Sequence, residues 1–214
     1  MSCEAMARFA PEILPAQALA QLNAGGRIGL LGGSFNPAHE AHRHISLIAL
    51  RRLKLDAVLW VVSPQNPLKS DLDSAPLAAR VERARELATD PRIFVTSLEQ
   101  SFGTHYTIDT IEALQRAFPK ARFVWLMGSD NLAQFHRWRR WKTIAQRVPI
   151  AVIARPDFTT AALASPAARF LLSSRIDPEA AQELPGRAPP AWVFLEERLD
   201  PASSTAIRAR GLWP

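Results

Sequence analysis

The sequence predicts an α/β protein built on a doubly wound parallel β-sheet, for two reasons. First, several short apolar runs, among them 57–62 and 150–153, are continuous, which is typical of strands buried on both faces of a parallel sheet. Second, segments with helical periodicity separate these runs, which indicates right-handed βαβ crossovers. In such sheets ligands bind at the carboxyl ends of the strands, beside the point where the strand order reverses.

The expected elements follow in order along the chain. Residues 1–26 form a lead-in segment, with a short helix over 16–22 and a flexible hinge at 23–26, and residues 27–214 form a single domain. Strands are predicted over 28–31, 57–62, 93–95, 122–127, 150–153 and 192–195. Helices are predicted from Asn36 to Leu53, over 76–88 with Ser74 as the cap, over 108–118, after 128–130 through Trp141, and over 203–210. The Ala- and Pro-rich segment 155–191 predicts irregular structure.

Length and composition indicate an intracellular protein with one core. The chain has 214 residues, of which 48% are hydrophobic. Cys3 is its only cysteine, which excludes an intrachain disulfide and a cysteine-based metal cluster. No apolar run approaches the roughly 18 residues of a membrane span and no secretory signal is recognisable, so we expect a cytoplasmic protein without a membrane partner. The net charge of +6 suits an anionic partner without specifying which.

The stretch 29–42 carries the clearest chemical signal. Gly32 and Gly33 follow the first strand and let the backbone turn sharply and approach a ligand. Asn36 and Pro37 predict the N-cap and the first residue of the next helix. A strand, a glycine turn and a helix N-terminus together make an anion site, because free N–H groups and the positive end of the helix dipole converge there.

Two histidines stand three positions apart just after this turn. His39 and His42 are expected on one face of the helix, where both imidazoles reach a bound phosphate. His42 is also in line with Ile45 and Ala49, a pattern equally typical of a core histidine. The preceding Gly-Gly turn favours the functional interpretation.

Five motifs in order indicate a family. Residues 32–42, Gly-Gly-Ser-Phe-Asn-Pro-Ala-His-Glu-Ala-His, resemble the phosphate-binding signature of the HxGH nucleotidyltransferases, although Ala41 replaces the usual glycine. The chain from 27 to 210 resembles, more narrowly, the bacterial nicotinate-nucleotide adenylyltransferases. The other motifs are Ser-Pro-Gln-Asn-Pro-Leu-Lys at 63–69, Tyr-Thr-Ile-Asp at 106–109, Met-Gly-Ser-Asp-Asn-Leu at 127–132 with Trp138, and Ser-Ser-Thr-Ala-Ile-Arg at 203–208. The resemblance implies a Rossmann-like sheet of the nucleotidyltransferase type.

The resemblance also implies a reaction, in which the phosphate of nicotinate mononucleotide attacks the α-phosphorus of ATP to give deamido-NAD and pyrophosphate. Mg²⁺ is expected on the ATP phosphates, held by phosphate and water rather than by a protein cage. Catalytic roles are implied for His39, His42, Lys69 and Arg208, with His42 at the reacting phosphate. ATP or phosphate binding is implied for Gly32, Gly33, Ser34, Phe35, Gly128, Asp130, Ser203, Ser204 and Thr205. Binding of nicotinate mononucleotide is implied for Asn66, Tyr106, Thr107 and Trp138.

Other interpretations of these residues stay open. Lys69 and Arg208 also fit ordinary surface cations, and Asp130 fits a capping residue. The basic aromatic run 136–142 fits either a nucleic-acid patch of a non-catalytic binding protein or an amphipathic helix with a solvated face. Alternative acceptors within the superfamily are nicotinamide mononucleotide, phosphopantetheine and, for cytidylyl transfer, glycerol phosphate. Trp138 and the 104–107 loop favour a pyridine mononucleotide, so we expect no nucleic-acid partner. The sequence leaves the oligomeric state open.

Overall fold

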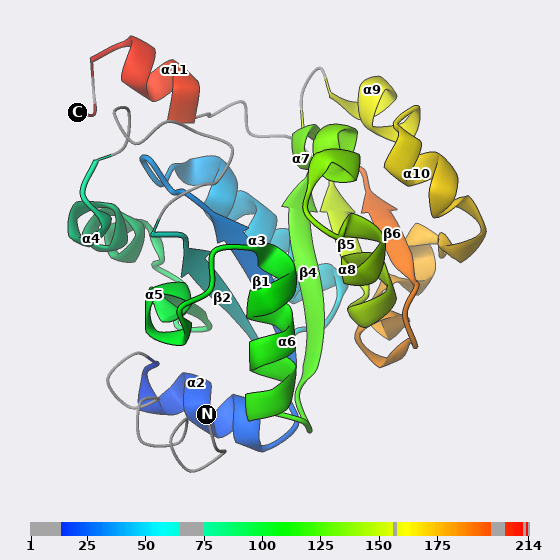
Figure 1. Ribbon diagram of the computed structural model, residues 1–214, viewed down its shortest axis with the longest axis horizontal. Coiled ribbons are helices and arrows are strands. Elements are labelled where there is room, and N and C mark those ends of the chain that lie inside the picture. The colour runs from blue at the N-terminus through cyan, green and yellow to red at the C-terminus, as the bar shows by residue number, and fades with distance from the viewer. Residues whose placement is uncertain (1–13, 65–74, 156–157, 198–203, 212, 214) are drawn as a thin grey trace.

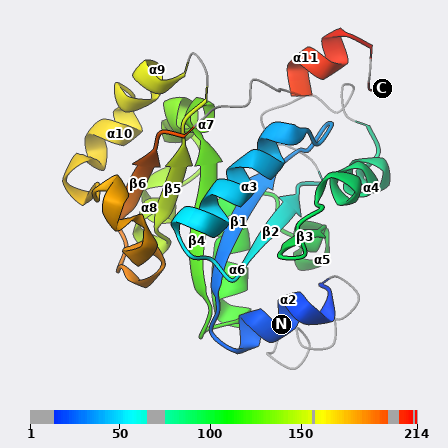
Figure 2. The ribbon, with the colours of Figure 1, turned by 180° about the vertical axis from the view of Figure 1, so that it is seen from behind.

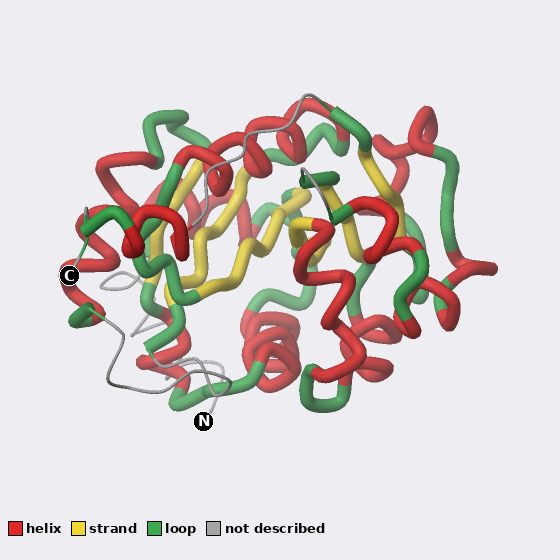
Figure 3. The backbone as a smooth tube through the Cα atoms, turned by 90° about the horizontal axis from the view of Figure 1, so that it is seen from above, coloured by secondary structure: helices red, strands yellow, loops and turns green. Residues whose placement is uncertain are grey.

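A six-stranded parallel sheet forms the centre of the molecule, with strand order β3-β2-β1-β4-β5-β6. The computed structural model describes residues 14–64, 75–155, 158–197, 204–211 and 213. Viewed from above, the sheet runs between two layers of helices (Figure 3). The strands are β1 (Arg27–Gly33), β2 (Ala57–Val62), β3 (Ile93–Thr96), β4 (Arg122–Gly128), β5 (Ile150–Ile153) and β6 (Trp192–Leu195). Each overlaps a predicted strand, so the doubly wound fold is confirmed.

Helices connect the strands and cover both faces of the sheet (Figures 1 and 2). The α-helices are α2 (Ala16–Asn23), α3 (Glu40–Arg52), α4 (Leu77–Leu87), α5 (Leu98–Phe102), α6 (Thr107–Ala117), α7 (Ser129–Gln134), α8 (Trp141–Arg147), α9 (Thr159–Leu163), α10 (Pro166–Phe170) and α11 (Ser204–Ala209). Short 3₁₀ segments are η2 (Phe135–Arg137), η3 (Leu172–Ser174) and η4 (Pro178–Gly186). No described helix is both long and apolar enough to cross a membrane.

Alternation along the strands divides the core between the two faces. Ile28 and Leu30 of β1 belong to the core cluster that also includes residues of α2, α6, α8, α9 and α10, whereas Leu31 belongs to the cluster that includes residues of α3, α4 and η4. This division follows from the period of two in a strand, and it explains why the strand sequences are continuously apolar. Leu14, Ala18 and Leu22 join the first cluster, so part of the lead-in segment belongs to the core.

One expectation about the helices is wrong, and one helix was not expected. The helix after β1 begins at Glu40 with His39 as its N-cap, not at Asn36 and Pro37. Asn36 is engaged elsewhere, because its Oδ1 accepts the backbone N–H of Ala75 over 3.2 Å. The helix α5 was not predicted, since its five residues are too few to show a period. The cap predicted at Ser74 lies outside the described residues, and α4 begins at Leu77, one residue after the predicted start.

The predicted helix through Trp141 is interrupted. After α7 and η2 the backbone is extended at Trp138, with ψ of 144°, and Arg140 has φ of 52° before α8 begins. Aromatic packing accounts for the break, because Phe135 contacts both Trp138 and Trp141 edge-on, with ring centroids 5.3 and 5.8 Å apart. A straight helix would not present both rings to Phe135 in this way.

The segment 155–191 is also more ordered than expected. It contains α9, α10, η3 and η4, and Ala162, Ala167 and Leu184 are fully buried. Two of its prolines begin helices instead of preventing them. Pro166 opens α10 behind a serine cap and Pro178 opens η4 behind an aspartate cap, positions where a missing N–H does no harm.

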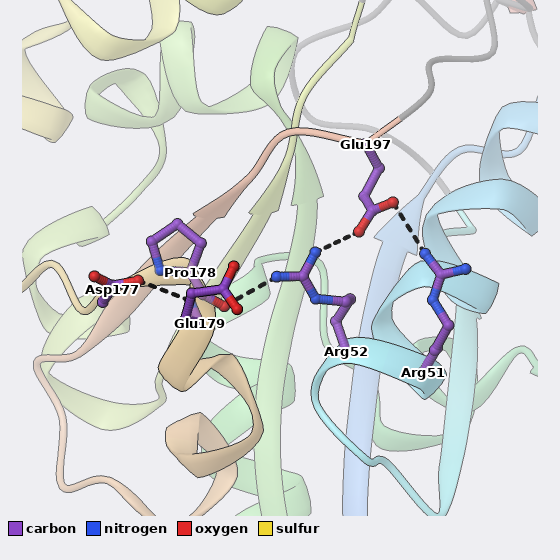
Figure 4. Close-up of polar contacts among 6 residues, drawn as sticks. All are labelled: Arg51, Arg52, Asp177, Pro178, Glu179 and Glu197. Atoms are coloured by element: carbon purple, nitrogen blue, oxygen red, sulfur yellow. Dashed lines mark hydrogen bonds and ion pairs between the residues drawn. The ribbon is translucent and has the colours of Figure 1, made fainter.

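An ion-pair cluster ties the exit of β6 to the end of α3 (Figure 4). Glu197 accepts from Arg51 over 2.9 Å and from Arg52 over 2.5 Å. Arg52 also donates to the carbonyl of Pro178 over 3.0 Å, at the start of η4. Two connections far apart in the sequence are therefore fixed to one helix end.

Candidate active site

The winding of the sheet reverses between β1 and β4, which are neighbours at its centre. The chain leaves β1 for α3 on one face, and leaves β4 for α7 and α8, with α8 on the other face. The carboxyl ends of the strands lie at the top in Figure 1, the end at which α7 and α11 are found. The motifs at 32–35 and 128–130 therefore lie at the edge where sheets of this kind bind ligands.

The turn after β1 holds a buried phenylalanine in a strained conformation. Phe35 has φ of 47°, in the left-handed region that residues with a Cβ seldom adopt. Its side chain is buried, stacks on Trp60 at a centroid distance of 5.3 Å and lies 4.5 Å from the ring of His42. Packing maintains a conformation that by itself costs about 1–2 kcal/mol. Such strain is concentrated where backbone meets ligand.

The two glycines of this turn have different roles. A Cβ on Gly32 would lie 2.5 Å from Cη2 of Trp125, so this glycine makes room for the indole. A Cβ on Gly33 would meet nothing closer than a ring carbon of Phe35 at 3.6 Å. Of the two, only Gly33 leaves space that a ligand can use.

The histidine pair lies ring to ring at the start of α3. The ring centroids of His39 and His42 are 3.9 Å apart, and the backbone N–H of His39 donates to Nδ1 of His42 over 3.2 Å. Because Nδ1 accepts this bond, the neutral imidazole of His42 carries its proton on Nε2. Burial, followed by the charges of His39 and Arg155, lowers the pKa of His42 well below its ordinary 6.5. His42 is therefore a neutral Nε2–H donor at physiological pH.

The C-terminal segment closes over the same turn. Oγ of Ser204 donates to the carbonyl of Pro37 over 2.9 Å, and the guanidinium of Arg208 donates to the carbonyl of Asn36. Nε1 of Trp213 donates to Oδ1 of Asn36 over 2.7 Å. The structure thus brings Ser204 and Arg208 to the histidine turn. Sequence reasoning missed Trp213, because a single aromatic residue outside the motifs carries no signal.

An ion pair spans the ends of β4 and β5. Nη1 of Arg155 lies 2.8 Å from Oδ2 of Asp130, and the backbone N–H of Arg155 donates to Ser129 over 2.9 Å. A Cβ on Gly128 would lie 2.4 Å from Oδ1 of Asp130, so the glycine permits this close arrangement. That Oδ1 is buried and accepts no hydrogen bond from the described residues. Sequence reasoning missed Arg155, although a cation directly after a buried strand was a usable signal.

Two residues implied to bind nicotinate mononucleotide come together on the α6 side of the sheet. Trp138 packs edge-on against Trp125 and Phe135, with ring centroids 6.1 and 5.3 Å apart. The guanidinium of the next residue, Arg139, lies 4.3 Å from the ring centroid of Tyr106. The histidine pair belongs to α3 on the opposite side, so the two sets of implied residues flank the switch point from both faces.

A buried carboxyl lies behind the 104–107 loop. Glu99 of α5 is buried and accepts a hydrogen bond from Oγ1 of Thr110 over 2.9 Å. The same hydroxyl lies 3.0 Å from Oγ1 of Thr104 and 3.3 Å from the carbonyl of Tyr106. Burial raises the pKa of Glu99 against the opposing effect of its hydrogen bonds. Sequence reasoning missed this residue, because an isolated glutamate reads as a surface charge.

The remaining implied residues are placed only in part. Asn66, Lys69 and Ser203 lie outside the described residues. Thr107 is the first residue of α6, and Thr205 is exposed on α11. Across the described ranges, no three His, Cys, Asp or Glu side chains form a group that could hold a metal ion.

Comparison with known families matches residues 30–210 to the family described as cytidylyltransferase-like. The chain belongs to this family. A cytidylyltransferase-like relative from Bradyrhizobium sp. (strain ORS 278), named probable nicotinate-nucleotide adenylyltransferase, is 54% identical over 85% of this chain and 95% of its own length. One of the same name from Parvibaculum lavamentivorans is 52% identical over 90% of this chain and 96% of its own length.

A solved structure supports the fold of this cytidylyltransferase-like chain. Plasmodium falciparum nicotinic acid mononucleotide adenylyltransferase complexed with NaAD superposes with a TM-score of 0.63, covering 86% of this chain and 83% of its own. The two sequences are 18% identical, so the likeness concerns architecture alone.

Proposed function

We propose that this protein transfers the adenylyl group of ATP to nicotinate mononucleotide, releasing pyrophosphate and forming deamido-NAD in NAD biosynthesis. The observation that carries the proposal is the pair His39 and His42 beside the strained turn at the switch point. The relatives from Bradyrhizobium and Parvibaculum, which are named for this activity and match most of the chain, support it.

For this reaction the protein must align the two substrates and stabilise the negative charge that develops on the departing pyrophosphate. An oxygen of the mononucleotide phosphate bonds to the α-phosphorus of ATP, and the bond from that phosphorus to the oxygen bridging to the β-phosphate breaks. Charge moves onto the departing pyrophosphate. The neutral Nε2–H of His42 donates to an α-phosphate oxygen, while His39 and the N–H groups of 32–35 hold neighbouring phosphate oxygens. Lys69 and Arg208 add positive charge along the triphosphate.

The rest of ATP is held by the segments after β4 and on α11. The unused Oδ1 of Asp130 accepts a ribose hydroxyl, and Gly128 leaves the space for that carboxylate to turn inward. Ser203, Ser204 and Thr205 offer hydroxyl donors to the outer phosphates.

The acceptor is held on the α6 side. Backbone N–H groups around Tyr106 and Thr107, at the start of α6, face the nicotinate carboxylate, because the first N–H groups of a helix have no partner within it. Trp138 stacks on the pyridine ring and Asn66 binds the mononucleotide. A carboxylate only accepts hydrogen bonds, whereas an amide must also place two N–H donors, so this loop selects the acid.

Mg²⁺ enters with ATP under this proposal. The described residues form no metal cage, and Mg²⁺ prefers oxygen ligands and retains water, so phosphate oxygens suit it. When bound, the ion neutralises phosphate charge. We place the reaction in the cytoplasm without a nucleic-acid partner. In the basic run 136–142, the exposed Arg139 lies over Tyr106 and the exposed Arg140 pairs with Glu112, so both guanidinium groups already have a partner within the protein.

The test is an assay of pyrophosphate release with ATP, Mg²⁺ and a panel of acceptors: nicotinate mononucleotide, nicotinamide mononucleotide, phosphopantetheine and glycerol phosphate, with CTP as an alternative donor. We expect nicotinate mononucleotide to exceed its amide by roughly ten- to a hundredfold in kcat/KM, because unmet buried donors cost about 1–3 kcal/mol each. Equal kcat/KM values for the acid and the amide would refute nicotinate mononucleotide as the preferred substrate. If no acceptor led to pyrophosphate release, the proposed enzymatic activity would be refuted.

A further inference from the structure

Arg80, in α4, is a buried cation that no described carboxylate neutralises. Its side chain is 2% exposed, and none of the ion pairs among the described residues includes it. Burial lowers the pKa of the guanidinium, which nevertheless stays charged because arginine is not deprotonated in proteins. A buried cation is expensive to desolvate, and an apolar residue of similar volume fills such a position as well or better. Its presence here calls for a reason beyond packing.

Among the described residues, the hydrogen-bond partners of this guanidinium are all main-chain carbonyl groups. Nε donates to Ala75 over 2.8 Å, Nη1 to Ser34 over 2.6 Å and to Ser63 over 2.7 Å, and Nη2 to Pro64 over 2.8 Å. Ser34 belongs to the turn after β1, Ser63 and Pro64 follow β2 directly, and Ala75 precedes α4. One side chain therefore joins three segments at the carboxyl edge of the sheet.

The bond to Ser34 fixes the peptide plane that leads into the strained residue. The C=O and N–H of a trans peptide point in opposite directions. A Ser34 carbonyl turned toward Arg80 therefore turns the N–H of Phe35 away from Arg80. A hydrogen bond from a charged donor is stronger than one between neutral groups, so it helps to hold the left-handed residue in place. Arg80 thus acts on the backbone that carries the implied phosphate contacts.

We propose that Arg80 is a positioning residue for adenylyl transfer. It holds the turn after β1 and the backbone after β2 in the geometry that receives the ATP phosphates, and its buried charge favours a polyanion at this edge. The inference rests on the proposed function, because ATP is the polyanion concerned. Phosphate supplies the negative charge that no described carboxylate supplies.

The test compares Arg80→Met and Arg80→Lys with Arg83→Met, a matched control on the same helix. Arg83 is exposed and, within the part of the chain that the structure describes, pairs only with Glu86, over 2.7 Å. We expect Arg80→Met to lower kcat/KM for ATP by about 10²-fold, as small displacements at a reacting centre do. Its ATP dissociation constant, measured by calorimetry, rises by about tenfold or more. The kcat/KM of Arg80→Lys falls between those of the wild type and Arg80→Met, because the ammonium group keeps the charge but cannot donate to all of these carbonyls in the planar arrangement of a guanidinium. Arg83→Met matches the wild type.

Each other outcome is decisive. If both Arg80 variants are folded by circular dichroism and keep kcat and KM within about threefold of wild type, the proposal is overturned. It is also overturned if neither folds, because Arg80 then supports the whole fold rather than the site. If only Arg80→Met fails to fold, Arg80→Lys decides by the same threshold. A wild type that binds ATP but releases no pyrophosphate refutes the proposed function, and calorimetry on the Arg80 variants still tests the positioning role.

Discussion

At His42 a single hydrogen bond determines what the imidazole can do. The N–H of His39 occupies Nδ1, so the proton of the neutral ring is on Nε2, and the lowered pKa keeps the ring neutral. A neutral donor interacts with phosphate without a proton having to leave when product forms. We therefore expect His42→Ala to lower kcat by about 10²–10³-fold, with a smaller change in KM for ATP. Steady-state kinetics of the purified variant measures this, and near-normal turnover would remove His42 from the mechanism.

The lowered pKa of His42 also predicts how stability depends on pH and which protonation state is observed by NMR. As the pH falls below 6.5, the unfolded chain binds a proton at this imidazole before the folded protein does. The free energy of unfolding therefore decreases as the pH falls from 6.5 to the lower pKa of the folded His42, and below that pKa this residue causes no further loss. The imidazole signals of His42 in NMR spectra should consequently remain those of the Nε2–H form at pH 6. Titration of His42 with a midpoint near 6.5 would contradict the assigned protonation state.

The pKa of Glu99 is shifted upward, in the opposite direction to the pKa of His42. Its folded pKa is raised above the ordinary 4.5, so its contribution to stability is present below that pH and is lost as the pH rises through the folded pKa. Relative to wild type, Glu99→Gln should gain free energy of unfolding between pH 5 and pH 8, by about 1 kcal/mol. Urea denaturation at both pH values measures the difference, and Glu196→Gln, an exposed change, is the control. A difference that does not vary with pH refutes the expectation.

At the scale of elements, β1 and β4 must fit together under the turn. Gly32→Ala brings a methyl group within 2.5 Å of the Trp125 ring, whereas Gly33→Ala meets only ordinary contacts. We expect Gly32→Ala to lower the free energy of unfolding by about 1–3 kcal/mol and Gly33→Ala to change it little. Gly33→Ala should instead raise KM for ATP, because its methyl group projects into ligand space. Thermal unfolding and kinetics of the two variants test this, and equal losses of stability would refute the division of roles.

The strands could be predicted from the sequence, whereas several helix boundaries could not. The strands were predictable because a strand buried on both faces of the sheet needs a continuous apolar sequence, such as 57–62. The break at Trp138 was not predictable, because it depends on which rings Phe135 meets in space. The helices in 155–191 were hidden by prolines whose effect depends on whether they stand at the first position or inside a helix.

The site divides in the same way. His39, His42, Arg208 and Trp138 belong to motifs that can be read along the chain. Arg80 and Glu99 act through backbone carbonyls and a threonine hydroxyl, contacts that exist only after folding. Arg80 bonds to main-chain groups in all of its described contacts, and such groups leave no partner side chain to look for in the sequence.

At the scale of the molecule, the cluster in Figure 4 joins β6 to α3 across the sheet. Hydrogen bonding by Arg52, then the charges of Arg51 and Arg52, lowers the pKa of Glu197, so this contribution to stability is present above pH 4.5 and is lost as the pH falls through the folded value. We expect Glu197→Gln to cost about 1 kcal/mol at pH 7, since the pair is partly exposed, and nothing near pH 2. Urea denaturation of this variant and of Glu196→Gln measures it, and identical stabilities at pH 7 would show that the cluster contributes nothing.

The contacts of Asn36 have a consequence for how the protein is made. This residue is synthesised long before its partners, because Arg208 and Trp213 follow it by 172 and 177 residues. Most of the sheet is therefore translated before the turn acquires these partners. A nascent chain can therefore bury much of its core while this turn still lacks its contacts with Arg208 and Trp213. Under the proposed function, ATP then stabilises the chain only after these late residues have joined the turn.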